Sequence, residues 1–320
     1  MRRRISGNRR VARCGLLSSG WEPVLFSRRT LGIVVALAAL TGAACGARTA
    51  NPVATIGLDD FGDTVRSSAA RRVVSLNPVT TEIFFAIGAG QRLVGRTHWD
   101  LYPSAARTVP DLGSAMPPNV EAVLAVHPDL VVLYASTMNR SAARQLRDAG
   151  IPTIALRTDH VSDLRRTLVM LARAIGDGAS GARVADSVER TLAVVRARPR
   201  PARPPTVFWH IWDKPLLTIG RGSYMNELVE VAGAVNIFSD LNEPSPQITM
   251  EELVRRNPDY ILAGPVNAQS ILSSPAWQAV PAVRAGHVLI VDTTLVGRPG
   301  PRIGEAARHL RALILHDTIR

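Results

Sequence analysis

A stretch of fifteen residues occurs twice in this chain, at positions 119–133 and 249–263, and the two copies align without a gap. The first copy reads NVEAVLAVHPDLVVL and the second reads TMEELVRRNPDYILA. Each copy contains a helix-capping residue, a glutamate two positions later, a short helix, a Pro-Asp pair and an apolar strand. A repeated supersecondary unit of this kind predicts a chain built from two similar lobes.

The rest of the sequence indicates which class the lobes belong to. Short apolar strands alternate with helical segments on both sides of residues 161–198, which is typical of parallel sheets covered on both faces. Within 161–198 the apolar residues recur at helical spacing and no strand is visible. A looser second repeat, 82–89 against 227–234, keeps the same order. We therefore predict an α/β fold with two similar parallel-sheet lobes joined by a long helix.

The domain boundaries follow from these patterns. We place the N-terminal lobe at 55–157, the helical connector at 158–204 and the C-terminal lobe at 205–320. The connector ends in a proline-rich segment, 198–205, that cannot continue a helix. About 275 residues after the export signal are more than one compact core usually holds, which favours two lobes.

The first 44 residues have the character of an export signal. An arginine-rich stretch runs into the apolar segment Leu31–Ala44, which is shorter than the roughly 20 residues needed to span a bilayer. Small residues then lead to Cys45, in a pattern that resembles the bacterial lipobox, whose cysteine receives a lipid. Ordinary cleavage without lipidation is the alternative. Residues 45–54 are small and polar, so we expect them to form a tether for an exported, lipid-anchored protein.

Charge and motif content exclude several functions. Residues 1–44 contain eight arginines and one acid, so they carry seven of the twelve net positive charges, and the remaining charge gives no reason to expect nucleic-acid binding. The two cysteines are Cys14 and Cys45, which leaves the lobes without a disulfide or thiolate site. No two histidines have the spacing of a metal site, and no nucleophile or phosphate-loop motif occurs. We therefore expect no metal site, no resident cofactor and no enzyme.

A set of motifs in fixed order carries a family resemblance. They are RVVSLNPVTTEI (72–83), GAGQRLVG (88–95), YP (102–103), NVE (119–121), PDL (128–130), GRGS (220–223), AG (232–233), NIF (236–238) and RPGPR (298–302). This order, over roughly residues 55–315, resembles the periplasmic binding proteins for cobalamin and ferric siderophores. The resemblance implies a monomer with two lobes bridged by a rigid helix, a ligand in the cleft between them, and an ABC importer as partner, its permease dimer working with an ATPase.

The resemblance also implies ligand contacts. Trp99 stands where the cobalamin-binding members have a stacking aromatic residue, and Arg298 matches a ligand-contacting arginine at the opposite rim. Ile211 and Leu217 match apolar cleft positions. We add Trp212, from its place after the first strand of the C-terminal lobe, and Tyr134, the last residue of the expected strand 130–134. The expected contacts are Trp99, Tyr134, Ile211, Trp212, Leu217 and Arg298.

The identity of the ligand stays open. Ala115 and Ser245 fall where the cobalamin-binding members have tryptophans, so ferric siderophores and haem stand beside a cobalamin-like corrinoid. A cleft enzyme that processes such a chelate is a further alternative. The two tryptophans could instead pack within the lobes, and Arg298 could pair with a carboxylate of its own lobe. His98 and His210 could meet across the cleft as metal ligands, or serve only in packing.

The glutamates of the repeat are the strongest positional pair. Glu121 and Glu251 occupy the same place in the two copies, and the resemblance implies that they dock to arginines of the permease. Both also lie in a first helical turn, where a carboxylate is stabilised by the helix dipole. We expect docking for Glu121 and Glu251, and a capping box with Thr249 for Glu252.

Overall fold

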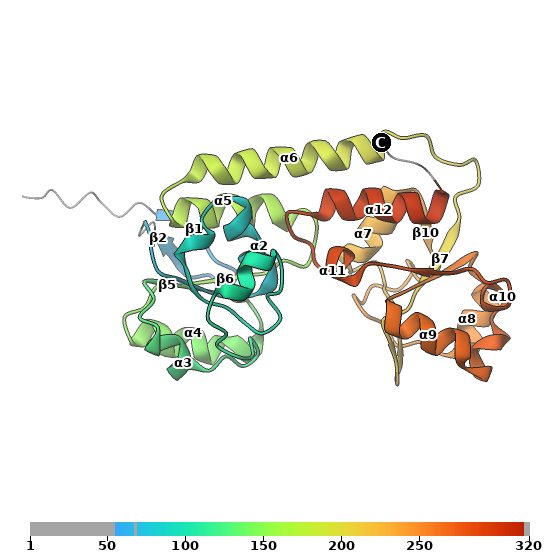
Figure 1. Cartoon of the computed structure of the whole chain (residues 1–320), viewed down its shortest axis with the longest axis horizontal. Coiled ribbons are helices and arrows are strands. Elements are labelled where there is room, and N and C mark those ends of the chain that lie inside the picture. The colour runs from blue at the N-terminus through green and yellow to red at the C-terminus, as the bar shows by residue number, and fades with distance from the viewer. Residues whose placement is uncertain (1–54, 67–68, 317–320) are drawn as a thin grey trace, which may run out of the picture. The chain divides into compact units, whose positions relative to one another are not determined.

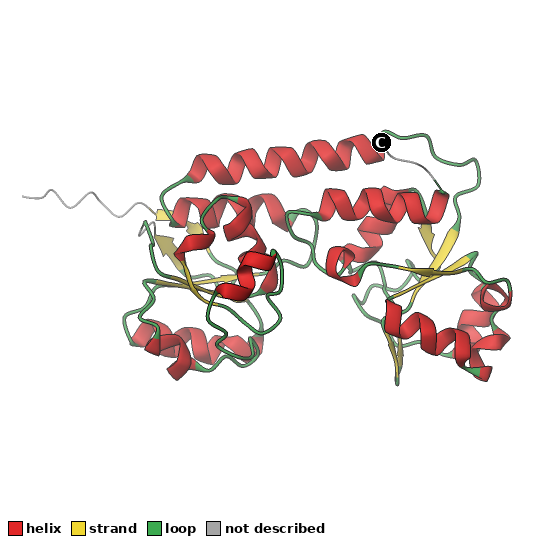
Figure 2. Cartoon of the chain, viewed as in Figure 1, coloured by secondary structure: helices red, strands yellow, loops and turns green. Residues whose placement is uncertain are grey.

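The computed structural model describes residues 55–66 and 69–316, which belong to one compact unit that begins at Pro52. The expected export signal, the expected tether and Cys45, the expected site of lipidation, lie outside these residues. Helices flank both sheets, as Figure 2 shows. No helix in the described part of the chain is long and apolar enough to cross a membrane.

The N-terminal lobe is built on a parallel sheet with the strand order β4-β3-β5-β6. Its strands are β3 (Val73–Leu76), β4 (Leu93–Gly95), β5 (Leu130–Tyr134) and β6 (Thr153–Leu156), preceded by an antiparallel hairpin of β1 (Thr55–Leu58) and β2 (Thr64–Arg66). Its helices are α2 (Pro78–Ala86), α3 (Val120–Ala125), α4 (Arg140–Asp148) and α5 (Asp163–Ala174), the last of which the sequence places in the connector. In Figure 1, α3 and α4 cover one face of the sheet and α2 and α5 cover the other.

The C-terminal lobe repeats this plan with the strand order β10-β7-β11-β12. Its strands are β7 (Thr206–Trp209), β10 (Val235–Asn236), β11 (Tyr260–Ala263) and β12 (Val288–Ile290), with a separate hairpin of β8 (Trp212–Asp213) and β9 (Leu216–Leu217). Its helices are α7 (Tyr224–Ala232), α8 (Met250–Arg256), α9 (Pro265–Ser273), α10 (Pro281–Arg284), α11 (Thr293–Val296) and α12 (Ile303–Leu315). The two sheets match strand for strand, which confirms the predicted fold class of two similar lobes.

The sequence repeat has a structural counterpart. The side chain of Asn119 accepts a hydrogen bond from the backbone of Ala122 at 3.0 Å, and Thr249 caps α8 in the same way. Each short helix is followed within two residues by a residue with φ of 45°, His127 in one lobe and Asn257 in the other. From the cap to the proline that follows this residue, the order of buried and exposed positions is the same in both copies.

A single helix, α6 (Gly178–Arg196), connects the lobes and packs on both of them. A methyl group at Gly181 would lie 2.4 Å from the carbonyl oxygen of Leu168 on α5, so the two backbones touch there. Near the other end, a methyl group at Gly304 of α12 would lie 2.7 Å from Thr191 of α6. Buried residues of both lobes and of α6 form one continuous apolar core. The long connecting helix of the prediction is therefore held tightly by both lobes.

Candidate functional site

A cavity of about 430 Å³ lies between the lobes and is lined by both. The N-terminal lobe contributes Tyr134, at the end of β5, and residues 158–160, which follow β6. The C-terminal lobe contributes Ile211, which follows β7, and residues 222–225 at the start of α7. These are carboxyl ends of parallel strands, where open α/β sheets bind their ligands. Of the six expected ligand contacts, Tyr134 and Ile211 line this cavity.

Tyr134 is held as a neutral phenol. Its hydroxyl donates a hydrogen bond of 2.6 Å to Asp159, which also lines the cavity. Burial and this bond to a carboxylate raise the pKa of Tyr134 to about 12. At neutral pH the cavity therefore presents a protonated phenol beside a carboxylate.

Tyr224 is the second tyrosine of the cavity, and it is held in the same state. Its hydroxyl donates to the backbone carbonyl of Val296 at 3.0 Å, and burial raises its pKa above the ordinary value. Ser223, the residue before it, caps α7 by accepting a hydrogen bond from Met225. Both phenols of the cavity therefore already donate a hydrogen bond within the protein.

Trp99 lies in a loop that is anchored from below by Asp100. Asp100 is fully buried and accepts hydrogen bonds of 2.5 Å from the hydroxyls of Thr81 and Thr97. Burial raises the pKa of the Asp100 carboxyl, against the lowering effect of these bonds. The Trp99 side chain is 60% exposed and touches the His98 ring, so it does not pack inside its lobe. It is free to contact a ligand.

Arg298 reaches across from the C-terminal lobe to this loop. Its guanidinium donates to the Trp99 carbonyl at 2.7 Å and lies 3.4 Å from Glu82 of α2. Arg302 binds the same carboxylate at 3.1 Å and stacks over the ring of Tyr102. The alternative of a carboxylate partner within the lobe of Arg298 is therefore wrong, because its partner, Glu82, belongs to the other lobe.

Glu227 makes a second contact between the lobes, and the looser repeat aligns this residue with Glu82. The carboxylate of Glu227 on α7 lies 2.9 Å from Nδ1 of His160, which follows β6 of the N-terminal lobe. Arg298 and Arg302 follow β12, which takes the place of β6 in the other sheet. Equivalent glutamates thus bind basic residues from equivalent places of the opposite lobe.

The hairpin β8–β9 holds the other two expected contacts. Trp212 pairs with Leu217 across the hairpin, and the backbone of Ile211 donates to the Leu217 carbonyl at 3.0 Å. The indole of Trp212 is 60% exposed and donates to the carbonyl of Lys214 in the hairpin turn. The structure therefore places Trp212 and Leu217 beside Ile211 but outside the residues that line the cavity.

The histidines do not form a metal site. His210 is buried against Phe208 and Trp277 in the C-terminal lobe, and its Nε2 lies 2.8 Å from Asp213. The idea that it meets His98 across the cleft is therefore wrong, since its ring faces the core. Within residues 55–66 and 69–316, no group of three or more His, Cys, Asp or Glu side chains could hold a metal ion.

The repeat glutamates lie on the surface. Glu121 and Glu251 are exposed, each in the first turn of its helix. Hydrogen bonds from its own backbone and from Thr249 lower the pKa of Glu251. The capping box predicted for Glu252 forms only in part, because its carboxylate binds Arg256 at 2.8 Å instead of returning to the cap. Neither Glu121 nor Glu251 takes part in an ion pair with a described residue.

Several residues of the site carried no signal in the sequence. Asp159 and His160 stand in a loop without a motif, and Pro244 and Ser245 reach the cavity from a distant turn. In the sequence, Ser245 is visible only as a departure from the cobalamin-binding members. Glu82 was visible in the repeat, but a repeat does not show which side chain lies opposite.

Comparisons with known proteins agree with this geometry. Residues 73–295 match the periplasmic binding protein family. The chain is 31% identical over 303 residues to the uncharacterized ABC transporter substrate-binding lipoprotein YvrC of Bacillus subtilis, covering 89% of this chain and 96% of that one. It is 29% identical to a vitamin B12-binding protein of Yersinia pestis, over 77% of this chain and 87% of that protein. The solved haem-binding protein RhuT of Roseiflexus superposes with a TM-score of 0.70 at 26% identity, over 77% of this chain and 98% of its own.

The family consists of substrate-binding proteins and not of enzymes, in agreement with the sequence. Its relatives include both vitamin B12-binding and haem-binding proteins, so membership of the family does not by itself identify the ligand. The chain belongs to the periplasmic binding protein family, as a substrate-binding protein of an ABC transporter.

Proposed function

We propose that the protein captures a cobalamin-like corrinoid in the cleft between its lobes and delivers it to the permease of an ABC importer. The observation that carries this choice is the state of the two cavity tyrosines. A ferric porphyrin with open axial positions is held by ligands such as phenolate, imidazole or thioether. Both phenols donate their proton to an acceptor within the protein, Tyr134 to Asp159 and Tyr224 to the carbonyl of Val296, so binding a metal as phenolate would cost each of them that hydrogen bond.

The charges near the cavity support a ligand of low net charge. Arg298 is already bound to Glu82 and to the Trp99 carbonyl, so it is not free to bind a carboxylate-rich chelate. The cavity itself offers hydroxyls, a carboxylate and backbone groups among apolar side chains. An amide-rich corrinoid, whose metal arrives with its own ligands, suits these groups better than an anionic siderophore.

Relatives whose ligand is known agree with this class. Vitamin B12-binding proteins and haem-binding proteins share the fold, and both carry large macrocyclic metal chelates. Trp99 supplies an exposed aromatic face of the kind that a planar macrocycle packs against. Ile211 contributes apolar surface to the cavity, and Leu217 and Trp212 stand beside it on the hairpin.

Ligand retention tests the proposal. Purified protein would be mixed with cyanocobalamin, haem or a ferric siderophore, and the bound fraction recovered by gel filtration. We expect about one corrinoid per chain and no chemical change in it. If only haem is retained, with its absorption shifted by an axial ligand, then the ligand is haem and not a corrinoid. Retention of none of the three would overturn the proposed ligand class.

The protein is exported, and we propose that Cys45 anchors it in the membrane by a lipid. The small polar residues 46–54 would then let the lobes stand away from the bilayer. Mass spectrometry of the mature protein checks this, since an acylated cysteine at the new amino terminus adds the mass of its lipid chains. Replacement of Cys45 by serine should release the protein from the membrane fraction, and continued membrane association would contradict the anchor.

A further inference from the structure

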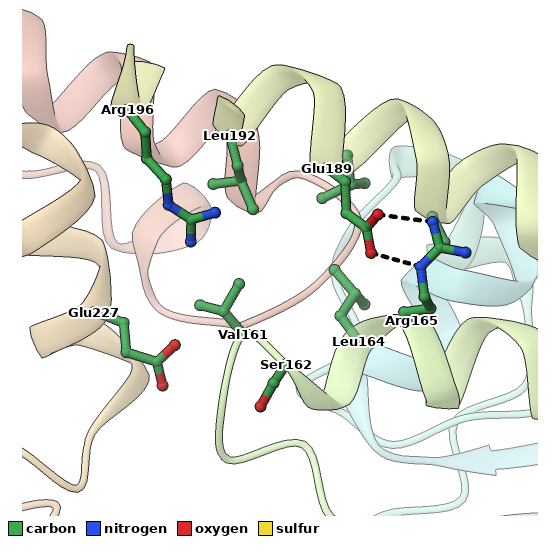
Figure 3. Close-up of a pocket in the computed structure, with 10 residues that line it drawn as sticks. Val161, Ser162, Leu164, Arg165, Glu189, Leu192, Arg196 and Glu227 are labelled. Carbon is green, nitrogen blue, oxygen red and sulfur yellow. Dashed lines mark hydrogen bonds and ion pairs between the residues drawn. The ribbon is translucent and has the colours of Figure 1, made fainter. Parts of the chain in front are cut away.

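A second cavity lies behind the cleft, between the connecting helix and both lobes. It has a volume of about 320 Å³, which falls at the lower end of small-molecule sites. We call it the connector groove, and it is lined by Val161, Ser162, Leu164, Arg165, Ala185, Val188, Glu189, Leu192, Arg196 and Glu227. Figure 3 shows these side chains converging from α5, α6 and α7.

The floor of the connector groove is apolar. Leu164 from α5 and Val188 and Leu192 from α6 are buried residues of the shared core, and half-buried Val161 packs against them. None of these four side chains carries a hydrogen-bonding group. A bound molecule would therefore need an apolar portion.

Most charges at the rim are already satisfied. Both carboxylate oxygens of Glu189 bind Arg165, which also pairs with Asp186. Glu227 binds His160 at 2.9 Å. Arg196 is the exception, since its guanidinium has no hydrogen-bond or ion-pair partner among the described residues. Figure 3 shows it extending from α6 toward the side of the groove where Glu227 lies.

We propose that the connector groove binds a small amphipathic carboxylate, with its hydrocarbon chain on the apolar floor and its carboxylate on Arg196. A guanidinium that lies beside apolar surface matches a carboxylate at the end of an alkyl chain, because the pairing can use two parallel N–H donors. An amine of the same length has no free acidic partner of comparable position, since Glu189 and Glu227 are engaged. The groove volume suits a chain of medium length.

The position of the groove relates it to the cleft. Residues 158–160 line the cleft cavity, whereas residues 161, 162, 164 and 165 line the groove, and the same change occurs along α7 between Met225 and Glu227. The pair His160–Glu227 therefore stands between the two cavities. A molecule in the groove would touch both lobes and α6 together, so its binding would be coupled to the way the lobes are held.

Calorimetric titration with octanoate tests the proposal on the intact protein. We expect one saturable site, with affinity rising by up to roughly fourfold for each methylene from hexanoate to octanoate. Octylamine should not bind. R196Q should weaken octanoate binding at least tenfold, whereas R190Q, on the same helix but outside the groove, should leave it unchanged. Both positions are exposed, so circular dichroism should show that both variants fold.

Specific outcomes would overturn the proposal. Equal affinity of R196Q for octanoate, or equal binding of octylamine, would remove the charge-based site. If cyanocobalamin displaces octanoate one for one, and R196Q does not change the affinity for octanoate, then octanoate binds in the cleft and not in the groove. Self-association in sedimentation experiments that R196Q abolishes would identify a second copy of the chain as the occupant instead. These results do not depend on which ligand the cleft takes.

Discussion

Glu82 and Arg302 lie 3.1 Å apart and join α2 of the N-terminal lobe to the residue that caps α12 of the C-terminal lobe. The carboxylate is 3% exposed and also receives Arg298, so two guanidinium groups of one lobe share one buried acid of the other. Glu227 and His160 make the corresponding contact with the roles of the lobes exchanged. Equivalent contacts between charged side chains thus join the two lobes of the duplicated fold.

Removal of the Glu82 charge should destabilise the protein. In E82Q two arginines lose their anionic partner in a mostly buried setting, and we expect the free energy of unfolding to fall by roughly 3 kcal/mol. Urea denaturation measures it. E227Q is the matched control, because that pair is more exposed and should cost less than about 1 kcal/mol. Equal effects of the two substitutions would contradict the difference in burial.

Tyr134 should make stability fall at alkaline pH. Its pKa is about 12 in the folded protein against about 10 in an unfolded chain, so the folded state resists ionisation. The contribution is complete below pH 10 and is lost as the pH rises from 10 to 12. Denaturation across this range should give a smaller decline in Y134F than in the parent. Ultraviolet titration should find a phenol that ionises late and disappears in Y134F.

Trp99 should affect the ligand and not the fold. Because its side chain is 60% exposed, W99A should leave the free energy of unfolding within about 0.5 kcal/mol of the parent. Loss of a stacking face should weaken corrinoid binding by roughly tenfold. W212A is a useful comparison, since that indole is equally exposed but folds onto its own hairpin. Unchanged affinity in W99A would remove Trp99 from the site.

Charge reversal at the repeat glutamates should separate binding from transport. E121R and E251R together should abolish uptake while ligand affinity stays unchanged, because both side chains are exposed on helices outside the cavity. E305R, an exposed glutamate in the first turn of α12, controls for the added charge. Lost ligand affinity in the double variant would place these residues in the ligand site, and normal uptake would remove them from docking.

The contact of α6 with α5 should tolerate no added methyl group. In G181A the new methyl would meet a backbone oxygen of α5 at 2.4 Å, so the helices must separate. We expect a loss of about 1–3 kcal/mol in urea denaturation. G178A, at the first residue of the same helix, would meet only the flexible side chain of Arg173 and should cost less. If G181A leaves the free energy of unfolding unchanged, then α5 and α6 can separate without cost.

The fold was predictable because its signals are local and repeated. The caps at Asn119 and Thr249, the Pro-Asp pairs and the apolar strands are patterns of neighbouring residues, and each formed as the spacing indicated. The helical stripe after residue 180 became α6 for the same reason. Where the two copies of the repeat carry the same pattern, each copy supports the structure predicted for the other.

The site was less accessible to this reasoning, because its contacts join residues far apart in the sequence. Arg298 was expected from a family position, yet its partner Glu82 lies 216 residues earlier. Asp159 and His160 have no pattern around them, and only the meeting of two loops gives them a role. For Glu252, a local motif indicated a capping box, but Arg256, one turn later on the helix, competes for the carboxylate.

The tight seating of α6 has a mechanical consequence. Both lobes grip this helix at glycine contacts that leave no room for a methyl group, and one continuous core runs through all three parts. Opening the cleft therefore requires the helix to bend or a contact to slide, in contrast to a loose hinge that swings at little cost. For a partner that holds both lobes at once, an occupied cleft would differ from an empty one mainly in how strongly the lobes resist being twisted. The positions of the lobes would change little.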